Sequence, residues 1–430
     1  MQRYESYKPS GIQWVENIPS HWGAERAKWL FNRMERPVRP EDDVVTAFRD
    51  GQVTLRTNRR TEGFTNAIQE HGYQGIRKGD LVIHAMDAFA GAIGVSDSDG
   101  KSTPVYAACV PRGEYPVNSY YYAYLLRYMA HSGYIESLSK GIRERSTDFR
   151  FAEFRELPLP IPDKDEQDRI VAFLDQKTAE IDAAIAKKER LIELLNEQKS
   201  IVTNHAVTRG LNPGAPVKDS GVSWLGEIPS HWMVKRVKHL ARKIVDGAHH
   251  TPTYVDSGVP FLRVTDISGG KKAIDLDNVK RIPEREHKAL CQRAFPQKGD
   301  VLLSKNGTIG ETIVVDWDYE FSIFVSLCLI KLREEIDPHF FCLYFSSPVV
   351  DLQLAEGGKR TSVTNLHLEK IKELVLALPP IEEQREIARM IRNQLSPYDD
   401  LIEKTHCELI ALNDFRKSLT ASVVVGVVKV

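Results

Sequence analysis

The chain has 430 residues and a formal net charge of −1, with 42% hydrophobic and 27% charged residues, which is ordinary for a globular protein of about three domains. No apolar run approaches the roughly 20 residues that cross a bilayer, and the first residues lack the apolar stretch of a signal peptide. The five cysteines show no C-x-x-C spacing, which argues against a zinc site or a disulfide framework. We therefore expect a cytoplasmic protein without a membrane partner.

The near-neutral charge also limits how the chain can bind nucleic acid. A DNA-binding protein usually carries a basic excess, and here acidic and basic residues are nearly balanced throughout. Any contact with DNA must therefore come from local clusters of basic residues. Alternatively, a partner protein supplies much of the phosphate neutralisation.

The sequence contains an internal repeat. Residues 10–22 return as 220–232, and residues 157–170 return as 374–387. Each half has a similar start and a similar helical end around a middle that largely differs. The Trp-x4-Pro-x-His-Trp element is present in both copies, so we interpret it as a structural anchor. The layout predicts one frame that carries two different recognition surfaces.

In the first head, roughly residues 10–157, the apolar run 80–84 predicts a strand, 91–94 a tight turn and 119–134 a short helix. Two clusters of arginines lie beside Ser, Thr, Asn or Gly. Arginine in such loops suits contact with phosphates and can bind guanine through two hydrogen bonds. A charge run is more often a solvated face, so these are candidates for DNA binding: Arg56, Arg59 and Arg60, and Arg143 and Arg145.

Two long helices follow the heads. Apolar residues seven apart over 165–203, without Pro or Gly, predict an amphipathic helix of about 58 Å. Gly and Pro within 210–216 end it. A second helix is predicted over about 382–422, with a kink or break at Pro397. We expect the two helices to pack as an antiparallel pair, and the alternative is that each folds back on its own head.

The second head, roughly 220–374, repeats the pattern with a strand over 300–304, a turn over 307–310 and a helix over 338–346. Adjacent histidines are poorly placed to share a metal ion, so the His249–His250 loop suits a base edge or a phosphate, or is a plain surface loop. A further basic pair follows Gly357 and Gly358, namely Lys359 and Arg360. Gly358 and Arg360 occupy the places of Gly141 and Arg143 in the repeat.

Motifs of catalysis are missing from the sequence. There is no G-x-x-x-x-G-K-[ST] loop, no G-x-G-x-x-G after a strand, and no ordered set of Ser, His and Asp. The sequence also lacks an Asn-Pro-Pro-Tyr signature for methyl transfer and a convincing pair of acids for metal-assisted phosphodiester cleavage. We therefore expect no enzyme active site in this chain.

The chain resembles the specificity subunits of type I DNA restriction–modification systems over essentially its whole length. The resemblance rests on the duplication, on the opening motif and on the Pro-x-x-x-Glu-Gln-x-x-Ile motif that begins each long helix. The second head adds family-like stretches at 246–252, 261–267 and 299–310. The motif residues are Lys218, Ser220, Gly221, Trp224, Ile228, Pro229, His231 and Trp232, then Pro162, Glu166, Gln167 and Ile170, and Pro379, Glu383, Gln384 and Ile387.

The resemblance implies an α+β fold with a pseudo-twofold repeat, in which two mixed α/β target recognition domains are joined by a pair of long antiparallel coiled-coil helices. The implied segments are a first recognition domain (1–157), a central helix (158–211), a linker (212–219), a second recognition domain (220–374) and a C-terminal helical region (375–430). Residues in the family-like stretches become candidates for DNA contact in the second head: His250, Thr251, Arg263, Lys305 and Asn306.

The resemblance also implies partners. Each head would read one half of an interrupted, non-palindromic double-stranded DNA target. The helices would dock two copies of the modification methyltransferase subunit and the restriction endonuclease/translocase subunits. The chain itself would bind no cofactor, because S-adenosylmethionine, ATP and magnesium belong to the partner subunits.

Two other readings of the sequence stay open. A stand-alone DNA-binding regulator would need its own basic surface, and a coiled-coil scaffold joining two protein-binding heads would have no affinity for DNA. The apolar C-terminal residues 422–430 either pair as a strand with the N-terminal region or fray.

Overall fold

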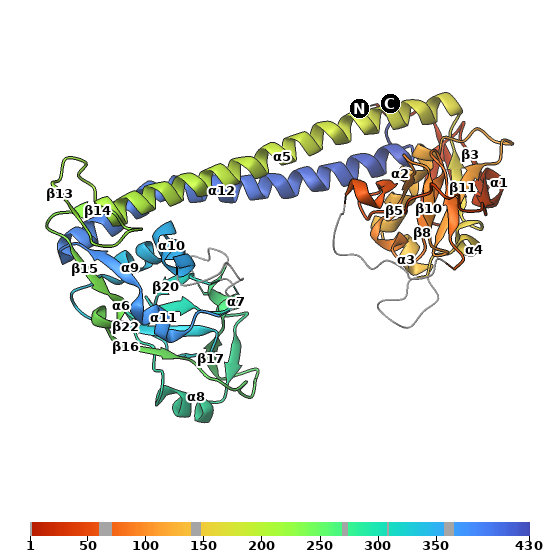
Figure 1. Ribbon diagram of the computed structural model, residues 1–430. Coiled ribbons are helices and arrows are strands. Elements are labelled where there is room, and N and C mark those ends of the chain that lie inside the picture. Colours follow the sequence, from red (N-terminus) through yellow and green to blue (C-terminus); the bar gives the residue numbers. More distant parts are fainter. Residues whose placement is uncertain (1, 60–70, 139–147, 269–273, 308, 357–364) are drawn as a thin grey trace. The chain divides into compact units, whose positions relative to one another are not determined.

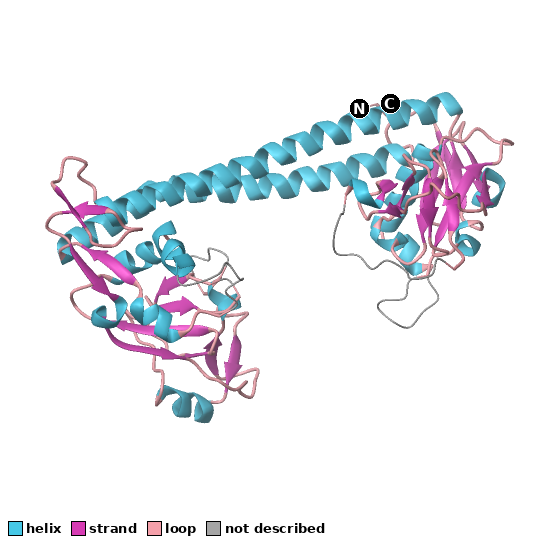
Figure 2. Ribbon diagram, viewed as in Figure 1, coloured by secondary structure: helices cyan, strands magenta, loops and turns pink. Residues whose placement is uncertain are grey.

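The computed structural model describes residues 2–59, 71–138, 148–268, 274–307, 309–356 and 365–430 (Figure 1). The chain divides into two compact units. The first contains Met1–Lys188 and Cys407–Val430, and the second contains Glu189–His406. Each unit combines strands, short helices and parts of the two longest helices (Figure 2). The division into five segments expected from the sequence stays a prediction.

The first unit begins with the first head. Its strands are β1 (Tyr7–Ile12), β2 (Val15–Pro19), β3 (Gly23–Arg26), β4 (Phe31–Met34), β5 (Val45–Ala47), β6 (Val53–Leu55), β7 (Gln74–Ile76), β8 (Leu81–His84), β9 (Ile93–Val95), β10 (Gly100–Ser102), β11 (Tyr106–Pro111) and β12 (Pro158–Ile161). Its short helices are α1 (Ala27–Leu30), η1 (Arg56–Asn58), η2 (Ala88–Ala90), α2 (Ser119–His131), α3 (Tyr134–Ser137) and α4 (Phe151–Phe154).

The core of the first head lies between a four-stranded antiparallel sheet and helix α2. The strand order is β4-β11-β8-β9. Helix α2 begins at the cap Asn118, whose side chain accepts a hydrogen bond from the backbone N–H of Tyr120. It buries Tyr121, Leu125 and Met129, which recur every four residues and share one face of the helix. The strand and helix predicted at 80–84 and 119–134 are present as β8 and α2.

The second unit contains the second head. Its strands are β13 (Val217–Asp219), β14 (Glu227–Pro229), β15 (Met233–Arg236), β16 (Ala241–Asp246), β17 (Val259–Leu262), β18 (Lys280–Ile282), β19 (Val301–Ser304), β20 (Thr312–Val314), β21 (Ser322–Ile323), β22 (Leu327–Leu332) and β23 (Val375–Leu378). Its short helices are α6 (Val237–Leu240), α7 (Val264–Ile267), α8 (Glu284–Cys291), α9 (Pro338–Phe345), α10 (Pro348–Glu356) and α11 (Leu368–Glu373).

The second head repeats the main sheet of the first. Its strand order is β16-β22-β19-β20, again antiparallel, and the predicted strand at 300–304 and helix at 338–346 are β19 and α9. Two antiparallel strand pairs also recur, β1-β2 as β13-β14 and β3-β12 as β15-β23, and the other strands differ. The second head has a three-stranded sheet β18-β17-β21, whereas the first has the pairs β5-β6 and β7-β10. The heads therefore share a frame and differ in what is added to it.

The two longest helices are α5 (Lys164–Arg209), with 46 residues, and α12 (Ile381–Val424), with 44 residues. Within the first unit they are joined by ion pairs from Lys188 to Glu408 at 2.6 Å and from Arg416 to Asp182 at 2.5 Å. Of the kink or break predicted at Pro397, the break does not occur, because α12 runs through that residue without interruption.

The C-terminal residues belong to the core of the first unit. Val423 and Val424 are fully buried, and the backbone N–H of Lys429 donates to the carbonyl of Gln2 at 2.9 Å. Of the two expectations for this tail, pairing with the N-terminal region is therefore the one observed, as a single antiparallel bridge.

In the part of the chain that the structure describes, no helix is both long and apolar enough to span a membrane. The same residues contain no group of three or more His, Cys, Asp or Glu side chains arranged to hold a metal ion.

Candidate nucleic-acid interface

A buried carboxylate fastens the first head to the start of α5. The indole N–H of Trp22 donates to Glu166 at 2.9 Å, His21 lies 2.9 Å from the same carboxylate, and the hydroxyl of Tyr4 donates to it at 2.6 Å. Burial alone would raise the pKa of Glu166, but these three hydrogen bonds together hold it below its ordinary value. The charged form therefore stabilises this junction.

The second head is fastened in the same way. Trp232 donates to Glu383 at 3.1 Å, and His231 lies 2.7 Å from the same carboxylate. In each unit a glycine packs closely on the tryptophan. A Cβ atom on Gly426 would lie 2.9 Å from Trp22, and one on Gly210 would lie 3.1 Å from Trp232. This geometry agrees with the interpretation of the repeated tryptophan element as a structural anchor.

The glutamine that follows each of these glutamates joins three backbone segments. The side-chain oxygen of Gln167 accepts from the N–H of Asn118 at 2.8 Å, and its nitrogen donates to the carbonyls of Pro116 and Pro162. In the second unit the oxygen of Gln384 accepts from the N–H of Asp337 at 2.8 Å. The glutamine thus fixes the start of the head's own helix to the start of the long helix.

Replacing Gln167 with Leu is expected to lower the free energy of unfolding of the first unit by about 3 kcal/mol, because a buried N–H and two carbonyls lose their partner. The measurement is thermal unfolding of the variant beside Gln176→Leu, a control on an exposed position of the same helix. An equal shift of the unfolding midpoint in both variants would contradict the role given to Gln167.

In the second head the ends of three strands meet. Asp246 at the end of β16 lies opposite Cys328, Ser304 at the end of β19 lies opposite Leu327, and Leu262 at the end of β17 lies beside Ile323. Because these partners all fall within residues 323–328, the segments that follow β16, β17 and β19 emerge close together. We call this place the strand-end site of the second head.

The strand-end site brings several predicted DNA contacts together. The backbone N–H of Lys305 donates to the carbonyl of Ser326 at 2.8 Å, and Val264, next to Arg263, donates to the Ser326 hydroxyl at 3.2 Å. Asn306 forms an isolated bridge with Asn365. Arg263 is far from Lys305 and Asn306 in sequence, but it is thus their neighbour in the structure.

These residues differ in exposure. The Lys305 side chain is 6% exposed and its ammonium lies 2.6 Å from the carboxylate of Asp246. Its positive charge is therefore balanced by Asp246 inside the head. The side-chain oxygens of Asn306 and Asn365 are buried and have no hydrogen-bond partner among the described residues. Arg263 is one-third exposed and lies 3.5 Å from Asp266.

The histidine loop follows β16 at the same place. Ala248 forms a bridge with Phe324, and beyond it His250 and Thr251 are exposed. His249, the neighbour of His250, instead lies 3.1 Å from the guanidinium of Arg293, and both line a small cavity of about 220 Å³.

The first head has a counterpart of the strand-end site that sequence reasoning missed. The N–H of Phe149 donates to the carbonyl of Ala85 at 3.0 Å, just as the N–H of Leu366 donates to that of Lys305 at 2.8 Å. Ala85 and Met86 therefore stand where the second head has Lys305 and Asn306. Here they border a cavity of about 470 Å³ that is also lined by Arg33, Tyr106, Arg150 and Phe151.

The predicted arginines of the first head lie elsewhere, next to the β5–β6 hairpin. Arg59 is 2.6 Å from Asp50 and covers the ring of Phe48 at 4.3 Å, while Arg56 donates to Thr46 at 3.5 Å. The other predicted basic residues lie outside the described residues, and their roles stay predictions: Arg60, Arg143, Arg145, Lys359 and Arg360.

Known proteins are similar to this chain in sequence and in fold. A family model described as "Type I restriction modification DNA specificity domain" matches residues 229–411. The chain is 28% identical over 272 residues to the type I restriction enzyme EcoBI specificity subunit of Escherichia coli, which covers 61% of this chain and 56% of that protein. The chain is thus similar to type I restriction–modification specificity subunits in the matched regions.

A second relative, the type I restriction enzyme EcoKI specificity subunit of Escherichia coli (strain K12), is 25% identical over 322 residues, covering 73% of this chain and 66% of that protein. The matches span less than two thirds of the length of either relative. A chain in a solved structure described as "Structural basis underlying complex assembly and conformational transition of the type I R-M system" superposes with a TM-score of 0.65 at 16% identity. It covers 96% of this chain and 99% of that chain, and supports the fold alone.

Proposed function

We propose that this chain is a non-catalytic DNA specificity subunit that reads a bipartite, non-palindromic target, with one head for each half-site. The observation that carries the proposal is the pair of strand-end sites. In the first head, the residue after β8, Ala85, is hydrogen-bonded to Phe149. In the second head, the residue after the equivalent strand β19, Lys305, is hydrogen-bonded to Leu366. The side chains differ, Ala85 and Met86 in one and Lys305 and Asn306 in the other. Equivalent positions with different chemistry suit the reading of two different half-sites.

Similarity to known specificity subunits supports the identity of the ligand and of the partners. Two relatives are named specificity subunits of restriction enzymes. A formal charge of −1 leaves little positive charge to spare for DNA. We therefore propose that the methyltransferase subunits help to enclose the duplex and supply part of the phosphate neutralisation.

The repeated anchors support a place for two methyltransferase copies. Glu166 with Gln167 and Glu383 with Gln384 give both units the same junction between head and long helix. A frame with internal pseudo-twofold symmetry presents equivalent surfaces to two identical subunits. S-adenosylmethionine would bind to the methyltransferase, and ATP with magnesium would bind to a restriction subunit.

The long helices are proposed to pair as an antiparallel coiled coil that sets the gap between the half-sites. The ion pairs of the first unit, Lys188–Glu408 and Asp182–Arg416, support this pairing, as does Lys199–Asp399 in the second unit. Along α5 the three paired residues follow in the order Asp182, Lys188 and Lys199. Their partners lie in the reverse direction along α12, as expected for an antiparallel pair.

The proposal is tested by measuring the affinity of the chain for double-stranded DNA with and without its methyltransferase partner, over a range of salt concentrations. We expect tight, sequence-specific and salt-dependent binding only in the complex. Specific binding by the chain alone would indicate a regulator, and no binding in any complex would indicate a protein scaffold.

Replacing Asn306 with Ala is expected to relax the preference for one base pair of one half-site about tenfold, because a side-chain amide contact to a base edge contributes roughly 1–3 kcal/mol. The measurement is the relative methylation rate of duplexes that differ at single positions. Asn278→Ala is the control, since Asn278 is an exposed asparagine of the same head that bonds to Asp275. An unchanged preference at every position would remove Asn306 from the site.

A further inference from the structure

A cavity of about 720 Å³ lies in the first unit where helix α2 of the head meets segments of α5 and α12. Its lining includes Arg49 and Asp50 from the hairpin that joins β5 and β6, Arg127 and His131 from α2, and Arg416 and Lys417 from α12. None of these residues belongs to the strand-end site or to the anchor around Glu166. The cavity is therefore separate from both of these sites.

Arg127 is the central cation of this cavity. Its guanidinium covers the ring of Tyr124 at 4.7 Å and donates to the backbone carbonyl of Asp50 at 3.2 Å. The described residues give it no ion pair. Burial lowers the pKa of Arg127, which is the expected result of holding a cation away from water. An arginine that is half-buried without a carboxylate partner is costly unless an anion joins it.

The carboxylates that line the cavity are already used by other cations. Asp50 lies 2.6 Å from Arg59, Asp182 lies 2.5 Å from Arg416, and Asp414 lies 3.7 Å from Lys417. Asp182 and Asp414 thus balance cations other than Arg127, and Asp50 is shared between Arg59 and Arg127. Tyr124, Asp50 and Asp175 favour the charged form of Arg127, but none of the described carboxylates forms an ion pair with its guanidinium.

Two glycines make room for the side chains of α2. A Cβ atom on Gly51, where φ is +90°, would lie 1.7 Å from the Arg127 guanidinium. A Cβ atom on Gly91, where φ is +94°, would lie 2.9 Å from the ring of His131. The pKa of His131 is lowered by burial and then by the nearby cations Arg127, Lys417 and Arg416, so its ring is neutral near pH 7 and competes little for an anion.

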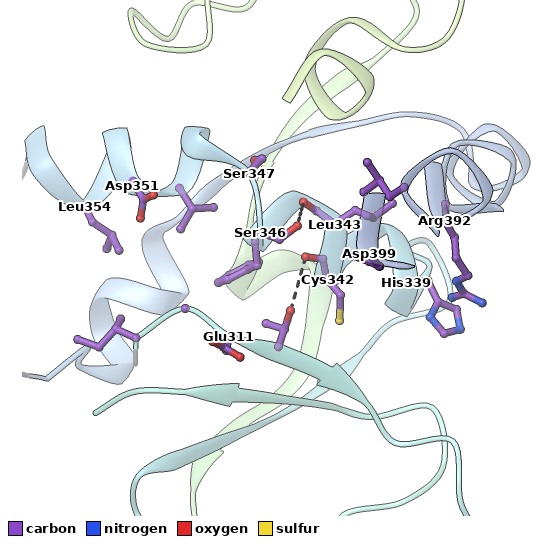
Figure 3. A pocket seen from close by; sticks show the side chains of 17 residues that line it. Glu311, His339, Cys342, Leu343, Ser346, Ser347, Asp351, Leu354, Arg392 and Asp399 are labelled. Atoms are coloured by element: carbon purple, nitrogen blue, oxygen red, sulfur yellow. Dashed lines mark hydrogen bonds between the residues drawn. The ribbon is translucent and has the colours of Figure 1, made fainter. Parts of the chain in front are cut away.

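The second unit has a cavity of about 640 Å³ at the equivalent place, between α9 and α12 (Figure 3). Counted from the helix caps Asn118 and Asp337, Arg127 corresponds to Ser346, and His131 to Val350. The charged residues of this second lining are Arg392 and three acids, Glu311, Asp351 and Asp399. The repeat therefore preserves the cavity but replaces its positive charge by an acidic surrounding.

We propose that the cavity around Arg127 binds a phosphate group of the DNA backbone beside the half-site read by the first head, and that the second unit lacks such a phosphate site. The proposal rests on the proposed function and adds a DNA contact outside the recognition surfaces. It is favoured over an acidic segment of a protein partner because two identical partner copies would require the same chemistry in both cavities. The cavity also adjoins the candidate DNA-binding arginines, since Asp50 contacts both Arg59 and Arg127.

The test uses the complex with the methyltransferase subunit and compares Arg127→Gln and Lys417→Gln with the matched control Arg392→Gln in the second unit. The affinity for target duplex is measured against salt concentration. Arg127→Gln and Lys417→Gln are each expected to weaken binding about fivefold to tenfold and to reduce the slope of log affinity against log salt by roughly 0.9 for each lost phosphate contact. The preference for target over random sequence should stay unchanged.

Phosphate ethylation interference then locates the contact. In the wild-type complex, ethylation of one phosphate near the first half-site should block binding, and this effect should vanish in Arg127→Gln but persist in Arg392→Gln. Lys417 is exposed at the surface of α12, so Lys417→Gln keeps the test valid if Arg127→Gln fails to fold.

The outcomes separate this inference from the proposed function. Specific DNA binding with an unchanged salt slope in both variants overturns the phosphate site alone, whereas absence of specific binding by the wild-type complex overturns the proposed function. Loss of methyltransferase subunits from the variant complexes, seen as a lower mass in solution, would identify the cavity as a protein-docking site. An equal loss of affinity in Arg392→Gln would contradict the asymmetry between the units.

Discussion

Asp246→Ala is expected to destabilise the second head by about 3–5 kcal/mol, because it leaves the ammonium of Lys305 buried without a partner. The two side chains are 10% and 6% exposed, and their charged atoms lie 2.6 Å apart. The second variant, Asp246→Ala with Lys305→Met, removes both charges and should recover much of the loss. Urea unfolding of both variants and of Lys305→Met alone gives the coupling energy between the two residues.

If the double variant unfolded as readily as Asp246→Ala, the ion pair would not be the source of the instability. The double variant also tests the role of Lys305 in recognition. Should it fold and methylate with wild-type preference, Lys305 supports the strand-end site from within the head and does not contact a base.

Inserting four residues after Lys188 in α5 is expected to abolish modification of the original target and create modification of a target with a longer gap. Four helical residues add about 6 Å, and one base pair adds about 3.4 Å along the duplex, so the gap should grow by one or two base pairs. The half-sites should stay the same, because neither head is altered. Methylation sequencing of the variant complex measures both quantities.

The control for this insertion is four residues placed after Gly214, which lies in an exposed turn of the linker outside the long helices. This variant should keep the original gap. A change in either half-site, or a longer gap in the control, would contradict the role of the helices as a spacer.

The frame of the molecule was predictable from the sequence because its contacts use residues that are repeated. Trp22 and Trp232 bond to the glutamates of the two Pro-x-x-x-Glu-Gln motifs, and the adjacent glutamines bond to the caps of α2 and α9. The residues of a contact that occurs twice in one chain form a repeated motif, which can be detected in the single sequence. The main strands and helices followed from the apolar periodicity between these fixed points.

The details of the candidate site were harder to predict, since they depend on packing between distant segments. Lys305 resembles a DNA-binding residue in sequence, and its burial depends on Asp246, which lies on another strand. Met86 has no basic or glycine-rich pattern around it, and it borders a cavity because Phe149 returns beside Ala85. Arg127 is one basic residue within a largely apolar helix, and the lack of an ion pair at its guanidinium is visible only in three dimensions.

The sequence did not predict the course of the chain at Pro397 or at the C-terminal tail, because tertiary packing determines both. Proline removes one backbone hydrogen bond and strains the preceding turn. Around Pro397, however, α12 packs against its neighbours through Ile391 and Leu395, and this tertiary packing keeps the helix continuous. The C-terminal tail, whose pairing or fraying could not be decided from its apolar sequence, is held because Val423 and Val424 fill the core around Trp22.

The most direct test of the account is to express the chain together with its methyltransferase subunit in a host without DNA methylation and to map the modified bases across the genome. The account predicts one two-part, non-palindromic motif with a gap of fixed length. A continuous or palindromic motif, or no modification from an intact complex supplied with S-adenosylmethionine, would contradict it.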